Sequence, residues 1–174
     1  MEILIIRHGQ AVDDAPGLGD AGRWLTGKGR KVTRRVAKWL AKQKDRCPAE
    51  VWTSPLVRSV QTAEIVAEAA GLTDEVAVVA ELSPSRDTAD ILRLLAQHQG
   101  GQPLALVGHE PSLSSLVTSL VGDIGWTGMK KSGVVAVSWD GRGPGVVRFV
   151  LDLKAMKAVD PAKDTQQQQA SRAR

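Results

Sequence analysis

The sequence is poor in several residue types, and each shortage excludes a class of protein. Cysteine occurs once in 174 residues, at Cys47, so the chain cannot form an internal disulfide, which fits a reducing compartment. Tyrosine is absent and phenylalanine occurs once, so the aromatic platforms on which many proteins stack nucleic-acid bases are scarce. No apolar run approaches the roughly 18 residues that a membrane-spanning helix needs. The first residues form no basic and then apolar leader, and we expect a cytoplasmic protein without membrane attachment.

The charge of the chain is unevenly distributed. The net charge is +4, yet residues 1–46 hold eleven Lys or Arg against five Asp or Glu. Most of this excess lies in an expected helix over 28–44. A solvated helix face is the ordinary explanation of such a run, and attraction of an acidic partner is the alternative. With so few aromatic residues, we expect no nucleic-acid partner.

Short apolar runs alternate with amphipathic segments along the chain. The apolar runs predict strands at 3–6, 51–53, 76–80, 104–107, 134–139 and 146–151, the last two as a hairpin. Helical spacing predicts helices at 28–44, from an N-cap at Ser54 with Pro55 in the first position to Gly71, around 91–95, and at 113–121. This order predicts an α/β fold: a three-layer α/β/α sandwich with a mostly parallel central sheet. We expect one domain over 1–159 and a disordered tail over 160–174.

One motif follows directly on the first predicted strand. Arg7, His8 and Gly9 come after four consecutive apolar residues, Ile3 to Ile6, and ligands of open α/β sheets bind beyond the carboxyl ends of such strands. Arginine offers a planar fork of donors that matches phosphate oxygens, imidazole is a nucleophile at neutral pH, and glycine lets the backbone approach a ligand. The motif therefore predicts an anion site, with phosphate as the first candidate.

Two further segments carry matching groups. Gly108 and His109 follow the strand at 104–107, and Arg58 lies in the first turn of the helix after the strand at 51–53. If these strands are neighbours in the sheet, His8, His109, Arg7 and Arg58 meet at one edge. Two histidines among arginines would repel a divalent cation, so we expect no metal.

Four groups of residues, taken in chain order, resemble the histidine phosphatase superfamily, which has the phosphoglycerate-mutase-like fold. Through Glu81-Leu82-Ser83-Pro84 and its compact length, the chain also resembles the short branch of that superfamily, the phosphohistidine phosphatases. The groups are Ile6-Arg7-His8-Gly9-Gln10, Leu25-Thr26 with Gly29, Thr53-Ser54-Pro55 with Arg58 and Gln61-Thr62-Ala63, and Val107-Gly108-His109-Glu110-Pro111. The resemblance extends from residue 2 to about residue 153.

The resemblance implies a role for each matching residue. His8 would be the nucleophile that is transiently phosphorylated, and Arg7, Arg58 and His109 would form the phosphate pocket. Gly9, Gln10 and Ser54 are secondary candidates for contacts with the phosphate. No cofactor is implied. A phosphoryl transition state spreads negative charge over its oxygens, so cationic donors suit this chemistry.

The general acid is a separate question. Glu81, after the third predicted strand, is the candidate for protonating an oxygen leaving group, and an exposed loop carboxylate is the alternative interpretation of the same residue. Asp13, Asp14 and Glu110 are weaker candidates. His98 stands near a helix end, and we expect it to be a solvated histidine of the last turn.

Four functions remain open at this stage. A phosphatase acting on phosphohistidine of a phosphotransfer protein is the first, and a small-molecule phosphomonoesterase of the same superfamily is the second. Only about sixteen residues separate Gly71 from Asp87, which leaves no room for a helical lid there and favours a protein substrate, although the loop at 10–24 could cover the pocket. A non-catalytic phosphate-binding module and nucleic-acid binding through the basic helix are the others.

Overall fold

A single mixed sheet forms the centre of the molecule. In the computed structural model, which describes residues 1–14, 17–43, 45–72, 76–124 and 128–160, the strand order is β3-β2-β4-β1-β5-β6-β7. The strands are β1 (Glu2–Arg7), β2 (Glu50–Thr53), β3 (Val76–Val78), β4 (Leu104–Gly108), β5 (Val134–Ser138), β6 (Val146–Asp152) and β7 (Lys157–Val159). The strands β1 to β4 are mutually parallel, and β5, β6 and β7 join them by antiparallel pairing. The predicted α/β sandwich is confirmed.

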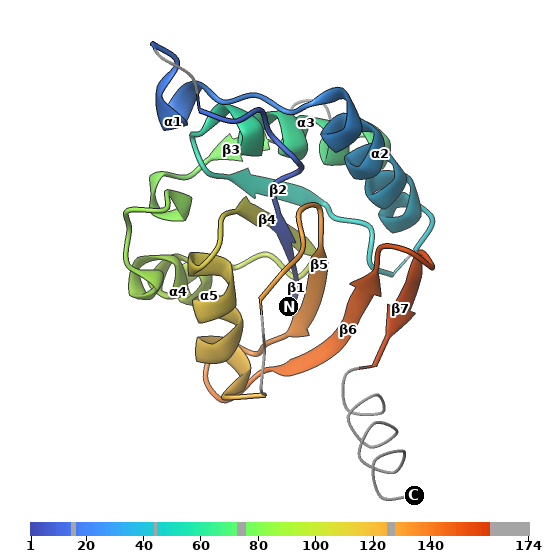
Figure 1. The fold of residues 1–174 in the computed structure, drawn as a ribbon. Coiled ribbons are helices and arrows are strands. Elements are labelled where there is room, and N and C mark those ends of the chain that lie inside the picture. Colours follow the sequence, from blue (N-terminus) through green and yellow to red (C-terminus); the bar gives the residue numbers. More distant parts are fainter. Residues whose placement is uncertain (15–16, 44, 73–75, 125–127, 161–174) are drawn as a thin grey trace, which may run out of the picture.

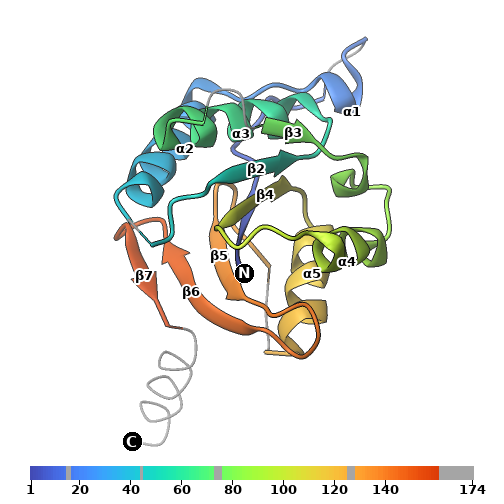
Figure 2. The same cartoon turned by 180° about the vertical axis from the view of Figure 1, so that it is seen from behind.

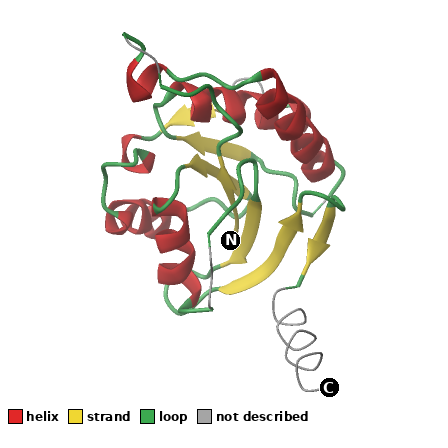
Figure 3. Ribbon diagram, in the orientation of Figure 1, coloured by secondary structure: helices red, strands yellow, loops and turns green. Residues whose placement is uncertain are grey.

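Helices cover both faces of this sheet. They are α1 (Gly19–Gly22), α2 (Gly27–Ala41), α3 (Val57–Ala70), α4 (Thr88–Gln97) and α5 (Ser112–Val121), with a 3₁₀ turn, η1 (Ala80–Leu82), after β3. In Figure 1, and in the reverse view of Figure 2, α2 and α3 lie on one face and α4 and α5 on the other. Figure 3 shows the strands as one curved layer between these two pairs. No helix in the described ranges is long and apolar enough to cross a membrane.

The alternation of side chains along β1 explains why the strand is central. Ile3 and Ile5 pack into the cluster beneath α4 and α5, whereas Leu4 and Ile6 pack into the cluster beneath α2 and α3. All four are at most 1% exposed. A strand that is buried on both faces needs apolar residues at every position, which is why Ile3 to Ile6 form a continuous run.

Sequence prediction was wrong at several element boundaries. The helix predicted from Ser54 begins at Val57, with Leu56 as N-cap. The Ser54 hydroxyl accepts from the Leu56 N–H at 3.4 Å and also lies 2.8 Å from His109 Nε2. The strand predicted over 76–80 stops at Val78, and the basic helix ends at Ala41 rather than at residue 44. Neither α1 nor β7, of four and three residues, was predicted. The predicted disordered tail lies outside the described residues apart from Asp160.

Candidate active site

The carboxyl ends of β1, β4 and β2 bring three segments of the chain to one edge of the sheet. β4 lies between β1 and β2 and is parallel to both. The main chain after each strand continues this pairing: the His8 N–H donates to the Gly108 carbonyl and the Ser54 N–H to the Val107 carbonyl, both at 3.0 Å. The condition set by the sequence, that β1 and β4 be neighbours, is therefore met. The rings of His8 and His109 lie 5.0 Å apart, centroid to centroid.

His8 is held as a neutral imidazole with one nitrogen free. Its Nδ1 lies 2.7 Å from the Gly9 carbonyl oxygen, and because a carbonyl only accepts, Nδ1 carries the proton and donates. The lone pair is then on Nε2. Burial, and after it the charges of Arg58, Arg7 and Lys131, lower the pKa of His8 to about 4. At neutral pH the ring is uncharged and suited to nucleophilic attack.

Arg7 and Arg58 supply positive charge to this edge. One terminal nitrogen of Arg7 donates to the Met129 carbonyl, which fixes the guanidinium, while its buried Nε has no hydrogen-bond partner among the described residues. Arg58, 5% exposed, lies in the first turn of α3 as expected. Burying the charge of an arginine costs free energy unless an anion pairs with it.

His109 faces two serine hydroxyls. Its Nε2 lies 2.8 Å from Ser54 Oγ and 3.2 Å from Ser59 Oγ, whereas its buried Nδ1 has no hydrogen-bond partner in the described part of the chain. Burial, then the neighbouring His8 and Arg58, lower the pKa of His109 to about 3. If Nε2 accepts from Ser54, the proton is on Nδ1 and that N–H is available to an anion. Ser54 therefore orients the ring of His109 through Nε2, the nitrogen opposite the one that faces the anion.

A second layer fixes the loop after β1. The Gly9 N–H donates to Thr62 Oγ1, whose hydroxyl donates to the Arg58 carbonyl, so the loop after β1 and helix α3 are directly joined. A Cβ on Gly9 would lie 2.7 Å from Thr33 Oγ1, so a larger residue would displace the loop. The Gln10 carbonyl accepts from the Thr26 N–H at 2.9 Å. The structure gives Gln10 this backbone role.

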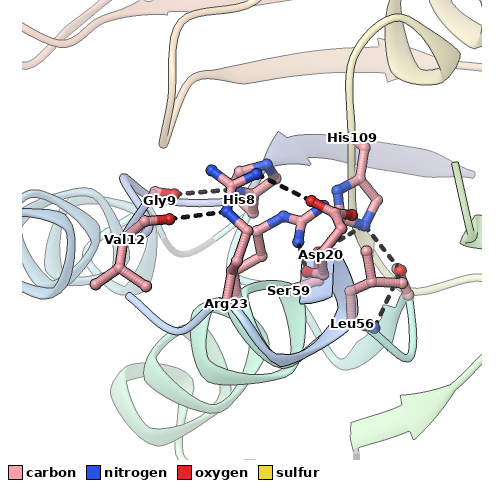
Figure 4. A network of polar contacts seen from close by, with 10 residues as sticks. His8, Gly9, Val12, Asp20, Arg23, Leu56, Ser59 and His109 are labelled. Carbon is pink, nitrogen blue, oxygen red and sulfur yellow. Dashed lines mark hydrogen bonds and ion pairs between the residues drawn. The ribbon is translucent and has the colours of Figure 1, made fainter. Parts of the chain in front are cut away.

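An acidic residue that sequence reasoning missed lies on Arg58. Asp20, in the short helix α1, accepts from both terminal nitrogens of Arg58, through its backbone oxygen at 2.6 Å and through Oδ2 at 2.9 Å. Its other carboxylate oxygen binds Arg23, and these arginines lower the pKa of Asp20. Figure 4 shows the contact of His8 with Gly9, that of Asp20 with Arg23, and that of His109 with Ser59 close to one another. The sequence offered only the loop at 10–24 as a possible cover, and its segment α1 does reach the site.

The proposed acids are positioned differently from one another. Glu81 lies in η1, after the edge strand β3 and on the same edge of the sheet, and it is partly buried. Glu110 accepts from the Met129 N–H at 3.1 Å, which gives it a structural role. Asp13 is exposed.

Two further side-chain predictions can be compared with the structure. The prediction that His98 is solvated is wrong. His98 is the C-cap of α4, its side chain is only 13% exposed, and its ring packs edge-on against Trp52. Among the described residues no group of three or more His, Cys, Asp or Glu is arranged to hold a metal ion. The arrangement at the edge is a neutral imidazole, His8, surrounded by cations and by neutral donors.

Comparison with known proteins agrees with this geometry. A family model described as histidine phosphatase superfamily (branch 1) matches residues 3–83. The phosphohistidine phosphatase SixA of Escherichia coli K12 is 30% identical over 164 residues, covering 91% of this chain and all of the relative. An uncharacterised protein of Picosynechococcus is 36% identical over 143 residues, covering 79% of this chain and 84% of its own. A structure of SixA in complex with tungstate matches with a TM-score of 0.80 at 30% identity, covering 90% of this chain and all of the other.

Proposed function

Because this chain belongs to the histidine phosphatase superfamily and is a phosphatase, we propose that it removes phosphate from phosphohistidine on a protein, with His8 as the nucleophile. The relative with the greatest coverage carries the name phosphohistidine phosphatase, and it aligns over nearly all of this chain. The coarser activity follows from membership of the family. The substrate and the residue roles are the content of the proposal.

The observation that supports the proposal most is the state of His8. The Gly9 carbonyl fixes Nδ1–H at 2.7 Å, and a pKa lowered to about 4 by burial and by nearby cations keeps Nε2 unprotonated at neutral pH. A neutral imidazole with an oriented lone pair is what nucleophilic catalysis requires.

The reaction follows in two displacements. The substrate phosphoimidazole carries a proton from solvent on its other ring nitrogen. Nε2 of His8 attacks phosphorus, the bond from phosphorus to the substrate imidazole breaks, and its electron pair stays on the substrate nitrogen, so that neutral imidazole leaves. Water then attacks the phosphorus of phosphorylated His8, which releases inorganic phosphate and restores the neutral imidazole. In both steps Arg7, Arg58 and the Nδ1–H of His109 are donors for the charge on the transferred oxygens.

Asp20 occupies the position on Arg58 that a phosphoryl group of the substrate would take. In the structure its carboxylate pairs with Arg58, so the buried guanidinium is neutralised. A bound phosphoryl group would compete for the same nitrogen atoms. Asp20 is itself unsuited to act as the general acid, because Arg58 and Arg23 hold its pKa below the usual range.

The nature of the leaving group supports phosphohistidine over an oxygen ester. Imidazole can be protonated on its other ring nitrogen, so its departure makes little demand on an acid of the enzyme. Glu81 makes no hydrogen bond or ion pair to the other described site residues. In the described part of the 71–87 connection the only helical element is the three-residue turn η1, which leaves that side without a helical lid.

A quench experiment tests the nucleophile. With a phosphohistidine peptide carrying labelled phosphate, rapid quenching should leave acid-labile label on the tryptic peptide that contains His8. His8→Ala should lower kcat/KM by more than about 10³-fold, as loss of a covalent nucleophile does. His98→Ala is the matched control and should retain activity, since His98 packs against Trp52 away from the site. Turnover by His8→Ala within about tenfold of wild type would contradict the assignment.

The substrate class is tested through Glu81. On the phosphohistidine peptide Glu81→Gln should retain nearly full activity, whereas on phenyl phosphate it should lose about 10²-fold if Glu81 protonates the phenolate. Equal losses on both substrates would favour the small-molecule phosphomonoesterase instead.

A further inference from the structure

The outward face of α2 carries cations that the reaction does not use. We define the basic face by six exposed residues of α2 and its C-cap: Lys28, Lys31, Arg34, Arg35, Lys38 and Lys42. Residues Gly27–Ala41 include no Asp or Glu. None of the ion pairs found among the described residues involves a member of the basic face. The face is therefore unneutralised over the whole helix.

The spacing of these cations works against the stability of the helix. Lys28, Lys31, Arg35, Lys38 and Lys42 follow one another at intervals of three and four residues, which places each beside the next along a single stripe. Like charges at these intervals repel, and each pair destabilises a helix slightly. Packing gives no return for this cost, because the apolar side of α2 (Val36, Ala37 and Leu40) makes the contacts with the core. An anionic partner would offset the repulsion.

The basic face begins at the rim of the active site. The amino-terminal end of α2 is packed against the loop after β1: the Gly29 backbone lies so close to the Gln10 carbonyl that a Cβ there would overlap it. Thr26 hydrogen-bonds Gln10 as well. From this end the helix extends over fifteen residues, or roughly 20 Å at 1.5 Å each. A partner lying along α2 would thus have one end beside His8.

Two more cations continue the basic face across the nucleophile loop. Lys130 and Lys131 are exposed and precede Ser132. Ser132 joins both sides, since its hydroxyl contacts Thr33 of α2 at 3.0 Å and its N–H donates to the carbonyls of Arg7 and His8. The charge of Lys131 acts on His8 itself, where it helps to lower the pKa of the imidazole. Positive charge therefore extends from the far end of α2 to the catalytic edge.

We propose that the basic face of α2 binds an acidic surface of the phosphorylated protein and so presents its phosphohistidine to His8. This inference rests on the proposed function and names the recognition element for that substrate. Acidic proteins and nucleic acids both complement this face in charge. The substrate proposed above is a protein, and Trp24 is the only exposed aromatic side chain in the described ranges, whereas stacking the bases of single-stranded nucleic acid needs several. Attraction between unpaired surface charge and an oppositely charged partner raises the rate of association more than the affinity of the complex.

A pair of peptides tests the proposal. One phosphohistidine peptide has Asp and Glu on both sides of the phosphohistidine, and the other has Asn and Gln in the same places. At low salt the wild type should hydrolyse the acidic peptide with kcat/KM at least about tenfold higher. Lys31→Glu with Arg35→Glu should reduce this preference below about twofold, and salt near 0.5 M should do the same in the wild type.

The matched control reverses two exposed cations elsewhere. Arg93→Glu with Arg142→Glu makes the same change in net charge, at a groove between α4, α5 and the β5–β6 hairpin on the other face of the sheet, and should keep the preference. If both double variants preferred the acidic peptide to the same degree, the proposal would be overturned. It would also be overturned if Lys31→Glu with Arg35→Glu lowered kcat/KM equally on the acidic and the neutral peptide. Duplex DNA that bound with steep salt dependence only to the unaltered face, with no peptide preference, would assign the face to nucleic acid. Failure to hydrolyse either peptide, with phenyl phosphate still cleaved, would overturn the proposed function instead.

Discussion

At the scale of single residues, the fork of Arg58 is the feature with the clearest consequence for catalysis. Its two terminal nitrogens already bind two oxygens of Asp20, so the side chain is arranged for bidentate contact with an anion. Arg58→Ala should reduce kcat/KM by at least about 2 kcal/mol of transition-state stabilisation, or about thirtyfold. Arg58→Lys should recover only part of this, because an ammonium cannot reproduce the fork. Steady-state kinetics on phenyl phosphate give both values, and full recovery by lysine would show that charge alone is needed.

The two histidines also make stability depend on pH. Both have a pKa well below that of an unfolded histidine, about 4 for His8 and about 3 for His109, chiefly because of burial. Below a pH of about 6.5 the unfolded chain therefore binds more protons than the native one. The free energy of unfolding then decreases as the pH is lowered, by up to about 1.4 kcal/mol per pH unit for each histidine. From pH 7 to 5 we expect urea-derived free energies of unfolding to fall by about 2–4 kcal/mol.

The variant His8→Gln isolates one of the two contributions. Glutamine does not titrate, so the loss between pH 7 and 5 should be roughly halved. The same loss in the variant and in the wild type would show that His8 is not responsible. Carboxylates contribute little in this window, because their usual pKa values lie below it.

Residues that follow strands could be predicted, but residues that meet only in the folded chain could not. The meeting of His8, His109 and Arg58 at one edge could be predicted because each stands next to a recognisable apolar run or helix start. Asp20 and Ser59 could not be found in this way. Asp20 lies in a loop with no periodicity, and Ser59 matters only because of the rotation of α3 about its axis.

At the scale of elements, one glycine sets the distance between α2 and the loop after β1. A side chain on Gly29 would overlap the Gln10 backbone, whereas a Cβ on Gly27, two residues earlier, meets nothing within 4 Å. Gly29→Ala should lower the free energy of unfolding by about 2 kcal/mol or more, because backbone must move. It should also reduce kcat, since Gln10 follows His8 and Gly9 directly. Denaturant titration and steady-state assays measure both.

Gly27→Ala is the control for this substitution. It should be neutral or slightly stabilising, because alanine is the better helix former. If Gly29→Ala were equally harmless, the close approach of α2 to Gln10 would have no part in forming the site.

Helices and strands differ in how well the sequence predicts their limits. The run Ile3 to Ile6 and the glycine at position 71, which adopts a positive φ of 76°, are unambiguous signals. Ser54 and Pro55 form an equally good helix start, yet the helix does not begin there, and the Ser54 hydroxyl contacts His109. The same hydroxyl accepts from the Leu56 N–H at 3.4 Å, so it serves a local turn as well as the site, and the helix begins after that turn.

At the scale of the whole molecule, the domain boundary can be tested by truncation. β7 pairs with β6, and Met156 and Leu153 pack against the core beneath α2 and α3. A chain that ends at Asp160 should keep its melting temperature within about 2 °C and its activity. A chain that ends at Asp152 should melt several degrees lower, because about 2–4 °C is lost per kcal/mol in a protein of this size. Equal melting temperatures would show that β7 adds nothing to stability.

The order of the strands is a property that the sequence left open. The sequence indicated that β1 and β4 end in matching motifs, but their adjacency was only a condition. The edge strand β7, Lys157–Val159, is too short to give a periodic signal. Order depends on which faces pack together, and no local pattern contains that information.

The position of β1 has a consequence for synthesis of the chain on the ribosome. Its two neighbours are β4, from Leu104, and β5, which ends at Ser138, so the first strand made is completed only after most of the chain has been translated. Translation proceeds at about 5–20 residues per second, so the segment Ile3 to Ile6 has no partner strand for roughly 5–30 seconds after its synthesis. An apolar segment that is exposed for so long is a natural binding site for a chaperone. The strand that leads to His8 is thus also a part of the nascent protein that is at risk of aggregation.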